Sequence, residues 1–325
     1  MTHAIRFHQT GGPEVLKWEE VQVGDPGPKE VRLAHSAVGL NFIDVYHRNG
    51  LYPTAGLPSP IGMEAAGVVD AVGSEVTDLH VGDRVAYASP PLGAYAEARL
   101  INADLLVKIP DNVADETAAA MMLQGMTVQY LIRRTYRVKR GETVLFHAAA
   151  GGVGLIACQW LKSLGVTTIG TVGSAEKAAL AKAHGCTHTI NYSEENFVER
   201  VKELTNGQGV PVVYDSVGKD TWEGSLDCLQ PLGTMVSFGN ASGPVAPINL
   251  GILAQKGSLY LTRPTLMTYT AKRGDRVASA NELFEIVGSG DVKIEINQRY
   301  PLAEAAQAHR DLEARKTTGS TIFTL

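Results

Sequence analysis

A glycine-rich stretch, Ala149-Ala150-Gly151-Gly152-Val153-Gly154, separates two segments of different periodicity. The residues before it, 143–148, are rich in strand formers and predict a short buried strand. The residues after it, 153–164, carry apolar side chains at helical spacing, and Gly165 follows as a helix-ending glycine. The stretch is therefore predicted to turn the chain from a buried strand into a helix.

This turn has the form A-x-G-x-x-G, counted from Ala149. In a dinucleotide-binding turn of this kind, Gly151 leaves room for a pyrophosphate near the backbone, and Gly154 allows close packing of helix on strand. The helix N-terminus offers free N–H groups to the phosphates. Ala149 and the four residues from Gly151 to Gly154 would then contact the cofactor. Because Ala149 replaces the usual first glycine, an ordinary tight turn is an alternative for the motif taken alone.

The chain that follows favours the dinucleotide-binding interpretation. Further strands are predicted at 167–172, 187–191, 210–216 and 234–238, and helices at 174–184, 193–205 and 222–229. Alternation of strands and helices at this spacing is typical of a parallel sheet wound on both faces. We therefore predict an α/β Rossmann domain, a doubly wound parallel sheet, over residues 125–260.

The end of the second predicted strand indicates which dinucleotide binds. An NAD site commonly has a carboxylate about 20 residues after the fingerprint, to bind the ribose hydroxyls. This chain has Gly173 and Ser174 there, with Lys177 three residues further on. Ser174 and Lys177 suit a 2′-phosphate, so we expect NADPH. The alternative for Lys177 is an ordinary solvent-exposed helix lysine.

Composition limits the class of protein. The chain has 325 residues, of which 44% are hydrophobic and 19% charged, and no apolar run reaches transmembrane length. Its three scattered cysteines and the lack of a signal-peptide pattern favour a cytoplasmic protein. The net charge of −5 argues against a protein built to bind nucleic acid.

The N-terminal part differs from the Rossmann part. It is rich in glycine, proline and short alternating apolar runs, which predicts an irregular β-rich domain. A helix over 115–126 leads into the Rossmann domain, and a final strand over 320–325 returns to the first domain's sheet. We therefore predict one domain from 1–124 and 261–325, and a second from 125–260. In proteins of this design the active site is expected in the cleft between the two.

Several strings in this order resemble a known family. They are Asn41-Phe-Ile-Asp44, Gly62-Met-Glu-Ala-Ala-Gly67, Val81-Gly-Asp-Arg-Val85, the fingerprint from Ala148 to Gly154, and Val213-Tyr-Asp-Ser-Val-Gly218. Over its whole length the chain is similar to the zinc-independent NADPH:quinone oxidoreductases, the zeta-crystallin-like group of the medium-chain dehydrogenase/reductase superfamily. The resemblance implies a GroES-like N-terminal domain and a reductase that transfers reducing equivalents from NADPH to a quinone.

The departures from the zinc-dependent members of that superfamily affect the chemistry. Those members have a cysteine where this chain has Asn41 and a histidine where it has Met63, and they carry a four-cysteine lobe that this chain lacks. Asparagine and methionine are poor zinc ligands. The spacing of His184 and His188 is more typical of a loop than of a metal site. We therefore expect no bound metal.

Without zinc, the acceptor must already be electron-poor, as a quinone is, and hydrogen-bond donors must support it. The resemblance implies that Asn41 and Thr127 lie near the nicotinamide and that Tyr46 and Tyr52 face the acceptor. These four are the predicted catalytic residues. Each tyrosine is equally compatible with a half-buried side chain whose hydroxyl is satisfied within the protein. For Asp44 we expect a structural hydrogen-bonding role.

Further cofactor contacts are implied by position in the family. Contacts are already expected from the fingerprint, from the residues after the second strand, and from Asn41 and Thr127. The resemblance adds Tyr130, Tyr192, Val217, Gly218, Gly239, Asn240 and Arg263. The alternative for the glycines among them is turn chemistry alone. Residues 259–263 predict an edge strand, and the resemblance implies that this strand pairs two Rossmann domains into a homodimer. Two other functions stay open: an NADPH-dependent enone or alkenal reductase, and an RNA-binding protein gated by NADPH.

Overall fold

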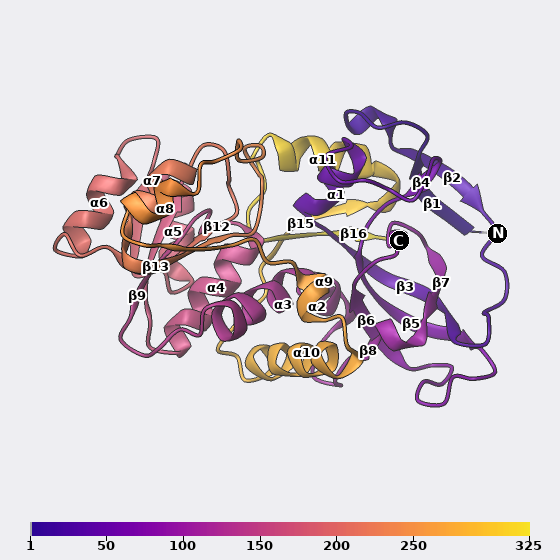
Figure 1. The fold of residues 1–325 in the computed structure, drawn as a ribbon. Coiled ribbons are helices and arrows are strands. Elements are labelled where there is room, and N and C mark those ends of the chain that lie inside the picture. The colour runs from indigo at the N-terminus through magenta and orange to yellow at the C-terminus, as the bar shows by residue number, and fades with distance from the viewer. Residues whose placement is uncertain (1) are drawn as a thin grey trace. The chain divides into compact units, whose positions relative to one another are not determined.

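The computed structural model describes residues 2–325, which form two compact units (Figure 1). The first unit runs to Met126 and resumes over Thr270–Gly288 and Ile294–Leu325, and the second comprises Thr127–Tyr269 and Ser289–Lys293. The predicted boundary at 124/125 lies close to the first crossing. The predicted boundary at 260/261 falls inside a strand of the second unit's sheet, so the units divide differently there.

The second unit is built on a six-stranded parallel sheet. Its strands are β9 (Thr143–Phe146), β10 (Thr167–Val172), β11 (His188–Asn191), β12 (Val210–Asp215), β13 (Leu229–Ser237) and β14 (Tyr260–Thr262). They lie in the order β11-β10-β9-β12-β13-β14. Counted from β9, this is the 3-2-1-4-5-6 order of a Rossmann sheet, whose switch point lies between the first and fourth strands. The predicted Rossmann fold is confirmed.

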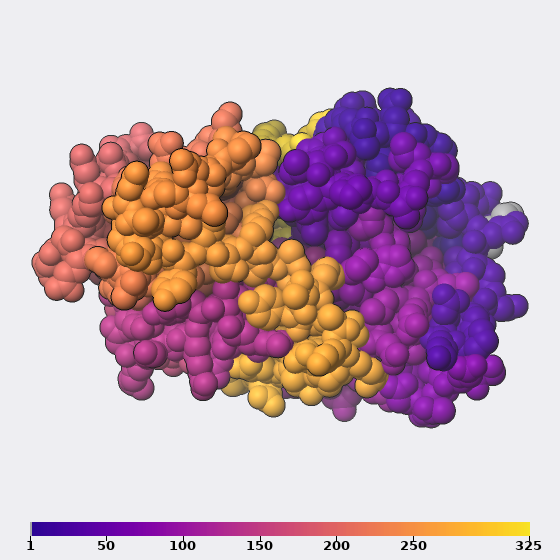
Figure 2. All heavy atoms as spheres, viewed as in Figure 1, coloured from indigo at the N-terminus to yellow at the C-terminus, as the bar shows by residue number. Residues whose placement is uncertain are grey.

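Helices cover both faces of this sheet. They are α4 (Gly152–Ser163), α5 (Ala175–Ala183), α6 (Phe197–Leu204), α7 (Trp222–Asp227), α8 (Gly251–Gln255) and α9 (Leu266–Tyr269). Apolar residues of α6, α7 and α8 share one core cluster with Leu145, whereas α4 and α5 share another with Val172. The orange segment that includes α8 forms much of the surface of this unit on the side shown in Figure 2.

The first unit is β-rich, as expected. Its strands are β1 (Thr2–Phe7), β2 (Lys17–Val21), β3 (Glu30–Leu40), β4 (Ser59–Pro60), β5 (Glu64–Val72), β6 (Arg84–Ala88), β7 (Ala98–Asn102), β8 (Val107–Lys108), β15 (Ile296–Pro301) and β16 (Ser320–Thr324). The main sheet has the order β15-β16-β3-β5-β6-β8, with β7 also paired to β3, and β2-β1-β4 forms a smaller sheet. The C-terminal strand β16 pairs antiparallel with β3, so the predicted return of the chain is confirmed.

The helices of the first unit are α1 (Phe42–Arg48), α2 (Asp115–Ala119), α10 (Arg273–Gly288) and α11 (Ala305–Glu313), and α3 (Met122–Tyr130) begins there. The single helix predicted over 115–126 was wrong, because the chain forms α2 and α3 with a break at residues 120–121. The predicted start of α6 at Ser193 was also wrong. The helix begins four residues later, where the Asn196 side chain accepts the N–H groups of Val198 and Glu199.

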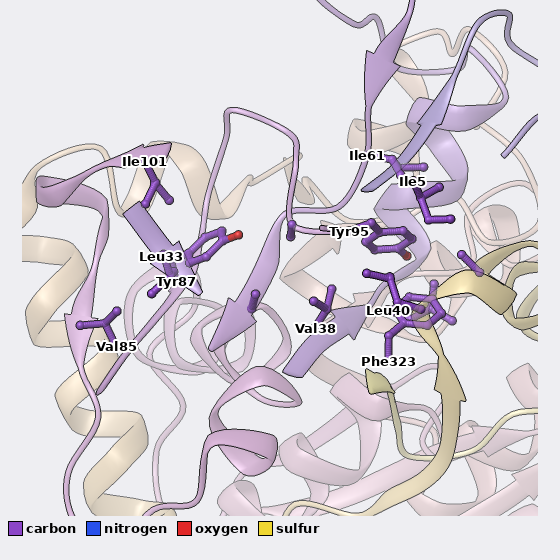
Figure 3. Close-up of a cluster of buried hydrophobic side chains, with 14 of the residues drawn as sticks. Ile5, Leu33, Val38, Leu40, Ile61, Val85, Tyr87, Tyr95, Ile101 and Phe323 are labelled. Carbon is purple, nitrogen blue, oxygen red and sulfur yellow. The ribbon is translucent and has the colours of Figure 1, made fainter. Parts of the chain in front are cut away.

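A cluster of buried apolar side chains joins the strands of the first unit (Figure 3). Tyr95 and Phe323 lie edge to face, with ring centroids 4.7 Å apart. Phe323 belongs to β16, while Leu33, Val38 and Leu40 of β3 belong to the same cluster. The C-terminal strand is therefore part of the N-terminal core. Among residues 2–325, no helix combines the length and apolar character needed to cross a membrane.

Candidate functional site

The fingerprint turn begins where β9 ends. Ala148 adopts a positive φ of 55°, and Gly151 is the residue that precedes the first turn of α4. No side chain caps this helix. The first N–H groups of a helix have no partner within it, so this end of α4 can bind an anion. The turn lies after β9, beside the point where the strand order reverses.

The two glycines of the turn meet different requirements. A Cβ atom at Gly154 would lie 2.3 Å from the carbonyl oxygen of Ala148 and 2.7 Å from the Cα of Ala149, so only glycine fits. A Cβ at Gly151 would meet only the Ala148 oxygen, at 3.3 Å, which leaves open space above that backbone. The Cβ of Ala149 packs against Gly170 of β10. A Cβ at Gly170 would lie only 2.6 Å from that atom, so the absence of a side chain there makes room for Ala149. The turn therefore fits a pyrophosphate.

A second group of predicted residues gathers at the ends of β10 and β11. Tyr192 follows β11, and its hydroxyl lies over Gly173, 2.6 Å from where a Cβ would stand. Ser174 caps α5 by accepting the N–H of Lys177 at 3.3 Å. The same hydroxyl hydrogen-bonds to Glu176 and holds the pKa of that exposed carboxyl below its ordinary value. Sequence reasoning did not find this contact.

A third group lies at the ends of β12 and β13. The buried Asp215 carboxylate accepts the N–H groups of Val217 at 2.8 Å and Gly218 at 3.0 Å. Gly218 has a φ of +88° that favours glycine. Arg263 donates to the carbonyl oxygen of Gly239 at 3.0 Å. It also donates to the side-chain oxygen of Asn240 at 2.9 Å, in the amide orientation that satisfies both groups.

The α3 helix carries two more predicted residues into the second unit. Thr127 and Tyr130 are both buried and hydrogen-bonded to each other. The ring of Tyr130 stacks on Tyr269, with centroids 4.5 Å apart and planes 12° from parallel. Burial raises the pKa of Tyr130, so its hydroxyl is protonated and can donate a hydrogen bond. The stacking partner Tyr269 was not singled out from the sequence.

The first unit holds three predicted donors, Asn41, Tyr46 and Tyr52. Asn41 precedes α1, Tyr46 lies within it, and the N–H of Tyr52 donates to the Tyr46 carbonyl at 2.9 Å. The two tyrosine rings meet edge to face, with centroids 5.2 Å apart. Asn41 and Tyr46 are buried, and Tyr52 is half-buried. Tyr46 and Tyr52 therefore contact each other, and Asn41 lies at the start of the helix that carries Tyr46.

Two buried carboxyl groups hold Asn41. Asp44 accepts its backbone N–H at 2.9 Å, and Glu64 accepts its side-chain N–H at 2.6 Å. Burial raises the pKa of Asp44 to about 7 and that of Glu64 to about 8, although hydrogen bonds from their neighbours act in the opposite direction. The structural role expected for Asp44 agrees with this contact, whereas the contact of Glu64 with Asn41 depends on long-range packing and has no local signal in the sequence.

Residues 2–325 contain no cluster of three or more histidine, cysteine or acidic side chains that could hold a metal ion. Met63, at the position that is a histidine in zinc-dependent members, is buried. His184 follows α5, and its ring bonds to the carbonyl of Leu180 at 2.8 Å. That the protein needs no zinc stays a prediction.

Comparison with known proteins agrees with both units. Residues 27–111 match the alcohol dehydrogenase GroES-like domain, and residues 152–276 match the zinc-binding dehydrogenase family. A quinone oxidoreductase of Pseudomonas aeruginosa is 61% identical over 99% of both chains. Escherichia coli quinone oxidoreductase complexed with NADPH aligns with a TM-score of 0.98 and 53% identity, over 99% of this chain and 100% of the other. A 2-haloacrylate reductase of a Burkholderia species is 48% identical over 99% of both chains.

A GroES-like unit and a Rossmann unit with a dinucleotide-binding turn define a dehydrogenase or reductase of the medium-chain superfamily. Within that superfamily, the chain belongs to the quinone oxidoreductase family.

The two fingerprint glycines should respond differently to substitution. Gly154→Ala forces a Cβ into the Ala148 carbonyl and should destabilise the protein by about 1–3 kcal/mol. Gly151→Ala should change stability by less than about 1 kcal/mol, because a Cβ there meets one atom only. It should still weaken NADPH binding at least about tenfold by filling the space over the backbone. Urea unfolding and a fluorescence titration of NADPH measure these effects, and unchanged NADPH affinity in Gly151→Ala would contradict this assignment.

Stability should fall between about pH 6.5 and pH 8. In the folded protein Asp44 and Glu64 keep their protons up to pKa values of about 7 and about 8, whereas in the unfolded chain they release them near pH 4. Their stabilising effect is therefore complete at low pH and is lost as the pH rises through the folded values. The buried His35 and His309 have lowered pKa values and act in the opposite sense only below about pH 6.5.

The measurement is the free energy of unfolding in denaturant across this pH range, for the wild type and for Asp44→Asn. The wild type should lose stability, and the variant should lose less. Stability that is constant or rises toward pH 8 would mean that the two carboxyls are ionised in the folded protein.

Proposed function

We propose that the chain is an NADPH-dependent quinone oxidoreductase that works without zinc. The observation that carries the proposal is the fingerprint turn, with its open backbone at Gly151, in a chain whose full length aligns with quinone oxidoreductases. Asn41, Tyr46 and Tyr52 of the first unit support it, because they would supply neutral donors for a quinone.

The second unit supplies the cofactor contacts in this proposal. The N–H groups of Gly152, Val153 and Gly154 would hold the pyrophosphate, and Ser174 and Lys177 the 2′-phosphate. At Ala149, Gly151 and Gly173 the backbone would closely approach the cofactor. Tyr192 would contact the adenosine. The remaining contacts would come from the ends of later strands, at Val217, Gly218, Gly239, Asn240 and Arg263. Thr127 and Tyr130, with Asn41, would lie near the nicotinamide.

The acceptor is supported by hydrogen bonds. NADPH, when bound, supplies the reducing equivalents. As a quinone takes them up, its oxygen atoms gain negative charge, and donors that strengthen with that charge lower the barrier. Asn41, Tyr46 and Tyr52 are such donors, and the pKa of Tyr130 is raised, so that hydroxyl too is available in its protonated form. We assign Asn41, Tyr46, Tyr52 and Thr127 as the catalytic residues.

The second candidate is reduction of an activated alkene, such as an enone, at the same site. It is favoured by one observation, the 48% identity to a protein described as a 2-haloacrylate reductase. Relatives described as quinone oxidoreductases are more similar, at 56–61% identity, so quinone reduction is preferred. An RNA-binding function is not favoured, because the net charge is −5.

The proposed protein is a cytoplasmic homodimer. The edge strand β14 exposes Tyr260 and Leu261, with 63% and 37% of their surfaces accessible. An exposed apolar edge strand is suited to pairing with the same strand of a second copy. This pairing would continue the parallel sheet of the second unit across a two-fold axis.

The proposed function is tested by following NADPH absorbance with a panel of quinones, enones and aldehydes. Quinones should be reduced fastest. Asn41→Ala and Tyr52→Phe each remove one donor worth about 1–3 kcal/mol to the charged transition state, so turnover with a benzoquinone should fall roughly tenfold to a hundredfold. NADPH affinity should stay within about threefold. Wild-type turnover in both variants, or activity with enones alone, would overturn the assignment.

Lys177 should determine the preference for NADPH over NADH. Lys177→Ala removes a charge-assisted contact to the 2′-phosphate, so the Michaelis constant for NADPH should rise roughly tenfold. The constant for NADH, which has no phosphate there, should barely change. Lys182→Ala on the same helix is the matched control and should alter neither value. Equal losses for both cofactors in Lys177→Ala would show that the lysine is only structural.

A further inference from the structure

Glu64 is a fully buried acid whose hydrogen-bond partners are all neutral donors. It lies at the start of β5. One carboxylate oxygen accepts the side-chain N–H of Asn41 at 2.6 Å, and the other accepts the backbone N–H of Leu123 at 2.7 Å. The backbone of Met122 also bonds to this carboxyl. Glu64 therefore connects the first turn of α3 to the residue that precedes α1.

The space for this carboxyl is built into the sheet. Gly39 of β3 faces it, and a Cβ at that position would lie 2.4 Å from the Oε2 atom of Glu64 and 2.4 Å from the carbonyl oxygen of Ala119. Any side chain at Gly39 would push the carboxyl away from Asn41. The fold thus leaves one specific place for the acid.

Asn41 is the middle of a chain of hydrogen bonds that run in one direction. The Ser320 hydroxyl donates to Gln124 Oε1 at 2.9 Å, Gln124 Nε2 donates to Asn41 Oδ1 at 3.1 Å, and Asn41 Nδ2 donates to Glu64 Oε2 at 2.6 Å. All four side chains are buried. Serine, glutamine and asparagine can each donate and accept, so these three could equally be arranged in the reverse direction.

Among these four side chains, Glu64 in its ionised form sets the direction. The N–H of Leu123 lies in the first turn of α3 and can only donate, so the group that faces it must accept. Above its pKa of about 8 the Glu64 carboxyl is ionised, accepts at both oxygens and therefore also accepts from Asn41. This turns the nitrogen of the Asn41 amide toward Glu64 and its oxygen toward Gln124.

We propose that Glu64 is a positioning residue that fixes the orientation of the Asn41 carboxamide. It keeps the second N–H of Asn41 Nδ2 as the donor offered to the ligand. The inference rests on the proposed function only for the statement that Asn41 serves the cofactor or acceptor. Glu64 thus orients the Asn41 donor before any ligand binds, so that the ligand does not have to reorient it.

The substitution Glu64→Gln reverses the chain without removing a partner. The glutamine oxygen must accept from Leu123, so its NH₂ group faces Asn41. Asn41 then turns its oxygen to residue 64, Gln124 turns with it, and Ser320 becomes the acceptor at the end. Every hydrogen bond can be remade, so the protein should fold, but Asn41 now presents an oxygen where it had presented an N–H.

The primary readout is the NMR signal of the Asn41 side-chain amide in protein without cofactor, labelled with ¹⁵N at asparagine and assigned through Asn41→Ala. This spectrum and the turnover assay are recorded at about pH 9, where Glu64 is ionised. This signal should shift in Glu64→Gln. Turnover with benzoquinone should fall about tenfold, while the NADPH dissociation constant stays within about threefold. Glu97→Gln is the matched control, since Glu97 also accepts one backbone N–H, from His3, and one side-chain donor, Thr2. It should leave the Asn41 signal and turnover unchanged.

An unmoved Asn41 signal in a folded Glu64→Gln protein would overturn the proposal, as would an equal effect of Glu97→Gln. If Glu64→Gln does not fold, the same NMR signal is measured in Gln124→Met, which removes the other side-chain partner of Asn41. Glu64 then holds the amide alone, so the Asn41 signal should keep the shift of the nitrogen-bound donor, and a reversed amide would overturn the proposal. If the signal moves in Glu64→Gln while Asn41→Ala turns over at the wild-type rate, Glu64 orients Asn41 but the proposed role of Asn41 in the reaction fails.

Discussion

The close approach of α4 to the end of β9 is the constraint on which the cofactor site depends. At Gly154 the two backbones are so near that a single methyl group would lie 2.3 Å from a carbonyl oxygen. This contact places the helix N-terminus directly after the strand, at the point where the sheet reverses its order. The strands on either side then contribute their own ends: Gly173 and Tyr192 from one side, and the turn held by Asp215 from the other.

In the first unit, a buried acid holds a predicted site residue in place. Gly39 leaves space for Glu64, and Glu64 joins α3 to Asn41. The groups that donate to it are neutral, and burial raises its pKa to about 8. A site of this kind has no strong charge to offer a substrate. It can offer oriented neutral donors, which suit an acceptor that is already electron-poor and needs only hydrogen bonds as its charge develops.

The sequence predicted those parts of the molecule that depend on local pattern. Strand and helix periodicity with a glycine turn was enough for the Rossmann sheet, because each element there is a complete strand or helix with its own signals. The break between α2 and α3 was missed, since the apolar pattern of residues 115–126 is continuous and the break itself, at Ala120 and Met121, has neither proline nor glycine. The partners of Asn41 were missed for a related reason. Glu64 and Gln124 lie 23 and 83 residues away in sequence, and only the folded sheet brings them to it.

The central claim is that this chain passes reducing equivalents from NADPH to a quinone with neutral donors and no metal. The most direct test is a single-turnover experiment on protein treated with a chelator and shown by elemental analysis to contain no zinc. NADPH-loaded protein is mixed with benzoquinone, and NADPH absorbance is followed. The account predicts rapid loss of NADPH at an undiminished rate. A reaction that stops in the metal-free protein and returns with added zinc would contradict it.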